Sequence, residues 1–134
     1  DSVFPLTRAK GVATLLMFAV RRIFSEPGRL QATLAELVQS GQLPTALVDE
    51  KSPLAFLTEQ PGPLGIIDAA YRYARHEPGV DVVLFGTGNI GHLQTNIQSI
   101  LADPLSAQAR ALAQQRFGHL VGVGLDVPGG PAKV

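Results

Sequence analysis

The feature that most constrains the fold is an apolar run from Val12 to Val20, which ends in Arg21 and Arg22. Apolar residues follow one another here without regular polar alternation. Such a run is typical of a strand that is buried on both faces of a parallel sheet. A buried helix is the competing interpretation, because periodicity does not separate the two in a short apolar run. The run is too short for a membrane helix, which needs roughly 18–20 apolar residues, so we expect no membrane insertion.

A second strand is predicted over residues 80–85, which are mostly apolar and rich in β-branched side chains. Apolar residues at helical spacing predict four helices. The first follows a start signal at Ser25–Gly28 and ends at Gly41, and the others cover 64–76, 90–101 and 105–117, the last opened by Ser106. In the third helix one apolar face is expected to point into a core; it carries Ile90, Leu93, Ile97, Ile100 and Leu101.

The segment 43–63 contains four prolines and predicts a long irregular connection with one short helical turn near 54–57. Residues 121–134 are rich in Gly and Pro and predict a flexible tail. The folded part is therefore expected to be residues 1–120.

Strands of the buried type that alternate with amphipathic helices predict an α/β fold with parallel pairing. The sequence provides about two such strands and four helices. Two strands do not make an independent parallel sheet with both faces covered. We therefore expect that further strands, or a partner chain, complete the sheet.

Charge and composition exclude several classes of protein. Eleven basic and eleven acidic residues give no net charge, so a general electrostatic nucleic-acid binder is not expected. The chain has no cysteine, which excludes disulfides and thiolate chemistry, and its three histidines lack metal-ligand spacing. No signal peptide is recognisable at the start, so a cytoplasmic protein is expected.

The chemically most informative stretch is Gly86-Thr87-Gly88-Asn89-Ile90-Gly91, which matches G-x-G-x-x-G between a predicted strand and a predicted helix. A helix start of this kind presents backbone N–H groups and partial positive charge to a phosphate. A Rossmann site also needs an acidic residue about 20 positions later, and Asp103 comes too soon while Asp126 comes too late. The alternative is that the glycines only make a tight turn between strand and helix.

The following residues extend the motif to Asn96: Asn89, His92, Leu93 and Asn96 give the pattern N-x-x-H-L-x-x-N. The whole segment resembles the last strand–helix unit of the aldo-keto reductases. Residues 68–80 resemble the helix and turn before that strand, residues 11–22 resemble the seventh barrel strand, and 104–118 resemble the closing helix. The resemblance covers residues 10–120 and implies the C-terminal portion of a (β/α)8 TIM barrel.

This resemblance implies roles by position. The family consists of oxidoreductases that act on carbonyl compounds with a nicotinamide dinucleotide, generally NADP(H). Phe18 would stack on the nicotinamide, and Arg21 would lie near the pyrophosphate. The residues expected to hold the adenosine side of the dinucleotide are Gly86, Thr87, Gly88, Asn89, His92 and Asn96.

Two departures from the family pattern affect these expectations. His92 stands where the family often has an arginine, so NAD(H) remains an alternative to NADP(H). The family's catalytic Asp, Tyr, Lys and His lie on early strands that this chain lacks, and Tyr71 and Tyr73 are expected outside the barrel. The chain alone is therefore predicted to be inactive. Its partner would be the remainder of the barrel. The alternative is a non-catalytic binding module that covers its open faces by forming a homo-oligomer.

Three polar features have structural interpretations. Asp81 lies at a strand start, opposite the active face of a barrel, so a structural role is favoured. Asp68 and Arg72 form an i,i+4 pair, which is expected on the surface with a small contribution to stability. His76 and His119 are expected at helix ends without a chemical role.

Overall fold

The computed structural model describes residues 3–49, 52–59 and 65–124. Within these ranges the sheet has two strands, β1 (Leu15–Met17) and β2 (Val82–Leu84), which pair in parallel. Leu16 of β1 lies opposite Val83 of β2. The predicted α/β class with parallel strands is thus confirmed.

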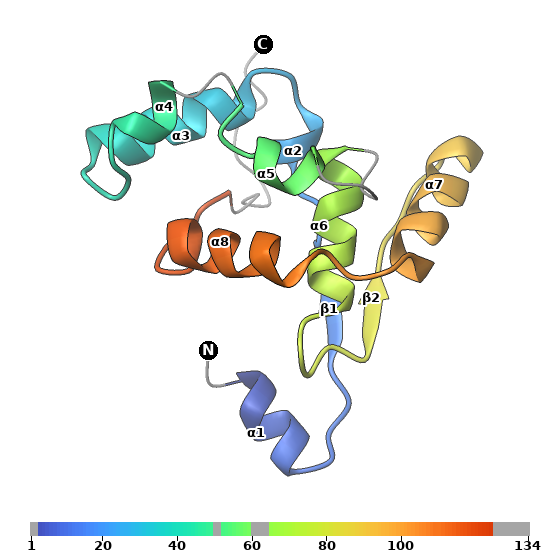
Figure 1. Cartoon of the computed structure of the whole chain (residues 1–134). Helices are drawn as coiled ribbons and strands as arrows, with labels where there is room; N and C mark the ends of the chain where they lie inside the picture. The colour runs from blue at the N-terminus through green and yellow to red at the C-terminus, as the bar shows by residue number, and fades with distance from the viewer. Residues whose placement is uncertain (1–2, 50–51, 60–64, 125–134) are drawn as a thin grey trace.

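Helices precede, connect and follow the two strands (Figure 1). They are α1 (Val3–Ala9), α2 (Arg22–Ser25), α3 (Arg29–Gln39), α4 (Ala46–Asp49), α5 (Ala55–Thr58), α6 (Ile66–Arg75), α7 (Ile90–Leu101) and α8 (Ala107–Phe117). None of the described helices is long and apolar enough to cross a membrane.

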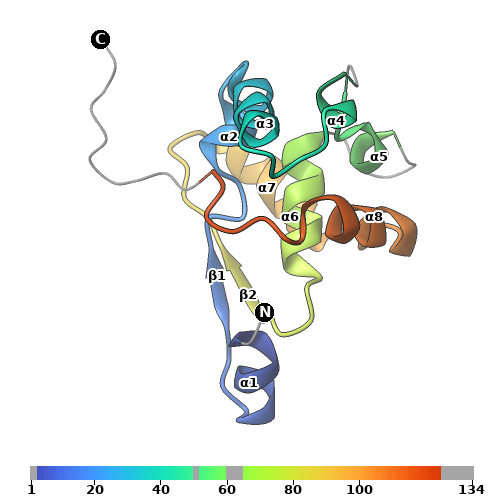
Figure 2. The same ribbon diagram turned by 90° about the vertical axis from the view of Figure 1, so that its left-hand side faces the viewer.

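Helix α6 packs against the sheet and carries much of the core beside it. Tyr71 and Ala74 of this helix form a buried cluster with Val80 and Val83, and Leu16 of β1 packs against that cluster. Residues 66–75 make this contact because their apolar side chains recur at helical spacing on one face. Figure 2 shows α6 and α8 on the same side of the strand pair.

The opposite face of the sheet is open. Leu15 and Met17 of β1 are 56% and 58% exposed, and Val82 and Leu84 of β2 are 43% and 40% exposed. The prediction of a strand buried on both faces is therefore wrong for the described part of the chain, because helices cover one face only. The apolar run itself is confirmed as a strand, although its ladder spans three residues.

Two further apolar clusters stabilise the helical part. Leu34 and Leu37 of α3 pack with Leu43 and Leu47 in one cluster. The other joins α6 to α8 and consists of Ala69, Leu105 and Ala109. The apolar core of residues 3–49, 52–59 and 65–124 therefore consists of three separate clusters.

Several local predictions are confirmed and one is wrong. Gly41 follows α3 with a φ of +71°, and the hydroxyl of Ser106 accepts a hydrogen bond from Ala109 N at the start of α8.

Ser25 does not open α3: it ends α2, and the residue before α3 is Gly28, with a φ of +76°. Helices α4 and α5 interrupt the predicted loop, and α5 matches the turn predicted near 54–57.

The apolar face predicted for α7 is buried only in part in the described structure. Ile90 and Leu101 are 74% and 80% exposed, and Leu93 and Ile97 are also exposed. Ile100 of the predicted face is half-buried and packs against the cluster that contains Tyr71 and Val83, and Ser99 beside it is the buried residue of this helix. Residues 60–64 and 125–134, which include Pro63 and most of the predicted tail, lie outside the described residues.

Candidate functional site

The predicted site residues that follow the two strands come together at one edge of the sheet. Parallel strands end at the same edge, so Phe18 after β1 and Gly86 after β2 lie in the same region. They line one hollow of about 390 Å³. Its lining residues are Met17, Phe18, Ala19, Val20, Tyr71, Leu84, Phe85 and Gly86.

Phe18 has an unusual backbone conformation for its residue type. Its φ is +61°, in the left-handed region that costs a non-glycine residue of order 1–2 kcal/mol. Its ring is not packed into a core, since the residue is 60% exposed. Arg21 lies against this ring, with its guanidinium carbon 5.2 Å from the ring centroid. A strained, exposed aromatic with a cation beside it presents a π-face at the edge of the hollow.

Two buried or half-buried aromatic residues form another wall of the hollow. The rings of Tyr71 and Phe85 meet edge to face, with centroids 5.8 Å apart and an interplanar angle of 67°. Burial raises the pKa of the Tyr71 hydroxyl. Neither residue was predicted as part of the site. Tyr71 was expected on a helix outside the barrel, and helical spacing alone does not show that its side chain reaches the strand ends.

The glycine-containing turn leads directly into α7 and is held by its own polar groups. Asn89 N donates a hydrogen bond to Thr87 Oγ1 at 3.2 Å. The Asn89 side chain is the cap of α7, since its Oδ1 accepts a hydrogen bond from His92 N at 3.1 Å. Asn89 thus has a structural role in addition to the predicted one in dinucleotide binding, because its side chain accepts a hydrogen bond from a backbone amide at the helix start.

Gly86 and Gly88 occupy open space. A Cβ atom added at either position would meet no atom within 4 Å, and neither residue has a φ in the left-handed region. Neither turn geometry nor packing against the described residues therefore requires glycine at these two positions. Their small size leaves the backbone accessible from the solvent side, as a phosphate group would need.

His92 and Asn96 lie one helical turn apart on α7, which places them on the same side of the helix. His92 is exposed and Asn96 is half-buried. Neither side chain makes a hydrogen bond to another residue within the described ranges. Both are thus available to a ligand that approaches the start of α7.

The hollow has no charged residue in its described lining, and the charge near it is positive. Arg21 contacts the Phe18 ring, and the first turn of α7, which follows the turn after Gly86, carries no acidic residue. No cluster of metal-ligating side chains exists among the described residues. The arrangement suits a ligand with an aromatic ring and phosphate groups.

Asp81 lies at the opposite end of the strands, as predicted. Its Oδ2 accepts a hydrogen bond from Thr14 N at 2.7 Å, which ties the starts of β1 and β2 together. His76 ends α6, and its Nε2 lies 2.9 Å from Ala102 O. These contacts give both residues structural roles.

Comparison of the chain with protein-family models, with curated proteins and with solved structures gave no match. The assignment of a function therefore depends on the sequence motif and on the geometry of the strand ends.

Proposed function

We propose that this chain is the C-terminal, dinucleotide-binding part of a (β/α)8 barrel that resembles the aldo-keto reductases. The complete protein would be an NAD(P)H-dependent oxidoreductase that acts on a carbonyl compound. The observation that carries the proposal is that Phe18 and Gly86, assigned from separate motifs, line one hollow at the carboxyl ends of adjacent parallel strands. In (β/α)8 barrels this end of the strands carries the active site.

The turn before α7 supports the phosphate part of the proposal. Gly86 and Gly88 have open space where other residues would have a side chain, and α7 begins at Ile90, directly after its cap residue Asn89. The backbone there and the side chains of Thr87, Asn89, His92 and Asn96 would hold the adenosine side of the dinucleotide. Phe18 would stack on the nicotinamide, and Arg21 would attract the pyrophosphate.

The open face of the sheet supports the barrel part of the proposal. Leu15, Met17, Val82 and Leu84 form an apolar surface that the described residues leave uncovered. In a closed barrel these alternating positions would fill the interior. The remaining strands would also supply the catalytic Asp, Tyr, Lys and His, so this chain alone would bind the dinucleotide without reducing a carbonyl.

Binding and turnover test different parts of this proposal. Titration calorimetry of the chain with NADPH and NADH should detect binding, with ATP and inorganic phosphate as controls for a general anion site. A complete barrel built from this chain and its missing strands should oxidise NADPH when aldehydes are added. No dinucleotide binding by either the chain or the complete barrel would contradict the assigned site.

A second candidate function is a non-catalytic module that assembles with copies of itself. The observation that favours it is the exposed apolar side of α7, at Ile90, Leu93 and Ile97, together with the open sheet face. Two measurements distinguish the binding module from the barrel. A stable homo-oligomer in light scattering favours the module, and an intact mass of the native gene product that corresponds to about 250 residues or more favours the barrel.

A further inference from the structure

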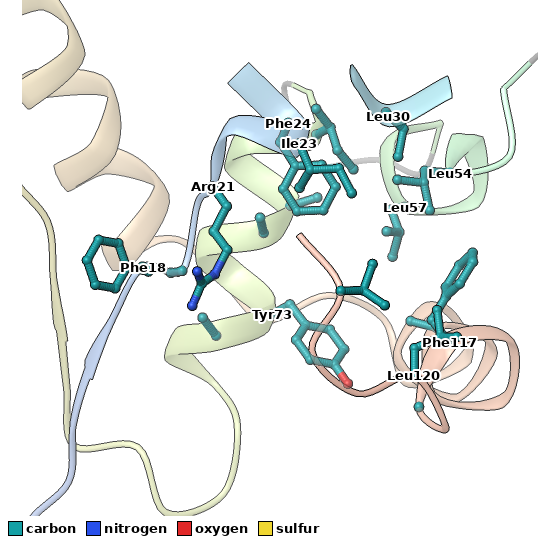
Figure 3. A pocket seen from close by; sticks show the side chains of 18 of the residues that line it. Phe18, Arg21, Ile23, Phe24, Leu30, Leu54, Leu57, Tyr73, Phe117 and Leu120 are labelled. Carbon is teal, nitrogen blue, oxygen red and sulfur yellow. The ribbon is translucent and has the colours of Figure 1, made fainter. Parts of the chain in front are cut away.

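A second cavity lies on the helical side of the molecule, and of the residues in the proposed dinucleotide site it shares Phe18 and Arg21. Its volume is about 530 Å³, within the range of about 300–1,000 Å³ that is typical of small-molecule sites. Residues from α2, α3, α5, α6 and α8 and the segments beside them line it. Figure 3 shows this helix-lined cavity, with apolar side chains that include Phe24, Leu30, Leu57 and Phe117.

Among the described residues, two charged side chains line the cavity, and they differ in their partners. Glu77 is neutralised, because its Oε2 accepts a hydrogen bond from Arg110 Nη2 at 2.9 Å. Arg21 forms no ion pair with any carboxylate in the described part of the chain; its described contact is the Phe18 ring. Arg21 extends between that ring and the apolar side chains (Figure 3). The cavity therefore has an apolar interior and one uncompensated positive charge at its side.

We propose that the helix-lined cavity binds an amphiphile with an unbranched apolar chain and one anionic head group, and that Arg21 binds the head. The apolar wall would gain about 0.8 kcal/mol for each buried methylene. The guanidinium would provide charge-assisted hydrogen bonds to a carboxylate. This proposal does not rest on the dinucleotide site, although Phe18 and Ala19 line both hollows and Arg21 is also the residue proposed to attract the pyrophosphate.

A concave cavity with walls from several helices suits a small ligand better than a second copy of the chain. The exposed apolar surfaces that another protein surface would cover are the sheet face with Leu15 and Met17 and the outer side of α7. These surfaces lie outside the lining of the helix-lined cavity. The amphiphile is thus the occupant to which we commit.

Calorimetric titration of the full chain with octanoate, decanoate and dodecanoate tests the apolar wall. Each pair of added methylenes should increase affinity about tenfold or more, and decanol should bind more weakly than decanoate. Equal affinity of the three acids, or no binding, would overturn the proposal. Sedimentation velocity over the same protein concentrations should give a mass that decanoate does not change. Loss of decanoate binding as a dimer forms would assign the cavity to a second copy and overturn it.

Three variants and one control variant test the site itself. Arg21→Gln should weaken decanoate binding at least tenfold and leave decanol unchanged, while Arg75→Gln, which changes an arginine outside the lining, should leave both unchanged. Ala70→Phe should fill the cavity from α6 and weaken both ligands. If Ala70→Phe melts at a lower temperature than the wild type, Ala113→Phe, which fills the cavity from α8, is tested in its place. Wild-type decanoate affinity in Arg21→Gln and in the folded filling variant would refute the site.

Discussion

The carboxylate of Asp68 lies 3.0 Å from Nε of Arg72, and the two side chains are only 7% and 12% exposed. They form a close ion pair within α6, although this nitrogen is not aligned for a hydrogen bond. Arg72 Nη1 also donates to the carbonyl oxygen of Asp103 at 3.4 Å, across to the end of α7. The prediction of a surface pair is therefore wrong, because i,i+4 spacing identifies neighbours on a helix but not whether other elements cover them.

Removal of one partner of this pair should destabilise the protein strongly. Arg72→Met leaves the buried Asp68 carboxylate without its cation, so the free energy of unfolding should fall by about 3 kcal/mol. Urea denaturation measures this change. Arg29→Met is the matched control, because its ion pair with Glu26 is exposed and contributes less than about 1 kcal/mol. Equal small losses in both variants would show that the Asp68–Arg72 pair behaves as a surface pair.

The exposed side of α7 predicts a weak effect of charge on folding and a strong effect on association. Ile97→Asp should lower the free energy of unfolding of the chain by less than about 1 kcal/mol, because Ile97 is 43% exposed. Val83→Asp should cost several times more, since Val83 is buried and an unpaired charge is expensive to bury. Thermal melting compares the two variants, and light scattering should show less self-association for Ile97→Asp. Severe destabilisation by Ile97→Asp would show that α7 buries this face.

The order of the two strands and of α3, α6, α7 and α8, and the parallel pairing, could be predicted from the sequence, because the apolar runs and the helical spacings are local signals. The short helices α1, α2 and α4 were not predicted. The start of α8 could also be predicted, since Ser106 is a cap of a preferred residue type. The apolar spacing of Leu93 and Ile97 could not show whether anything covers them, because burial depends on which elements surround the helix. The same argument applies to Ser25, whose capping potential is unused because the chain turns at Gly28.

The candidate site could also be predicted only in part from the sequence. Parallel strands bring their ends together, so the sequence order alone places Phe18 near Gly86. The contribution of Tyr71 to the same hollow depends on how α6 lies across the sheet, which spacing does not fix. The left-handed conformation of Phe18 was also not predictable, because phenylalanine rarely adopts it.

The two tyrosines predict a loss of stability at alkaline pH. Burial raises the pKa of Tyr71, and for Tyr73 burial and the nearby Glu77 carboxylate raise the pKa more than Arg110 lowers it. At a pH above about 10 the unfolded chain releases these protons while the folded chain retains them, so the free energy of unfolding falls as pH rises. Urea denaturation at pH 8 and above pH 10 checks this. Tyr71→Phe and Tyr73→Phe should each reduce the loss, and an unchanged loss in both would contradict it.

The strained backbone at Phe18 predicts that folding and binding respond differently to substitution. Phe18→Gly removes the left-handed penalty and one exposed ring, so stability should change by less than about 1 kcal/mol. Affinity for NADPH should fall by up to about tenfold, because the stacking surface is lost. Phe18→Tyr keeps the ring and should bind as the wild type does. Calorimetry and melting curves measure the two effects, and wild-type affinity in Phe18→Gly would remove Phe18 from the site.

Gly88 provides the sharpest test of the turn before α7. The added side chain of Gly88→Asp points into open space and should leave the fold intact, but its charge should repel a phosphate at the helix start and abolish dinucleotide binding. Gly88→Asn is the matched control, because it has nearly the same shape without the charge and should retain more of the affinity. Circular dichroism checks the fold, and calorimetry with NADPH measures binding. Equal affinities of Gly88→Asp and the wild type for NADPH would exclude a phosphate from this turn, because a carboxylate at this position would repel a bound phosphate and lower the affinity.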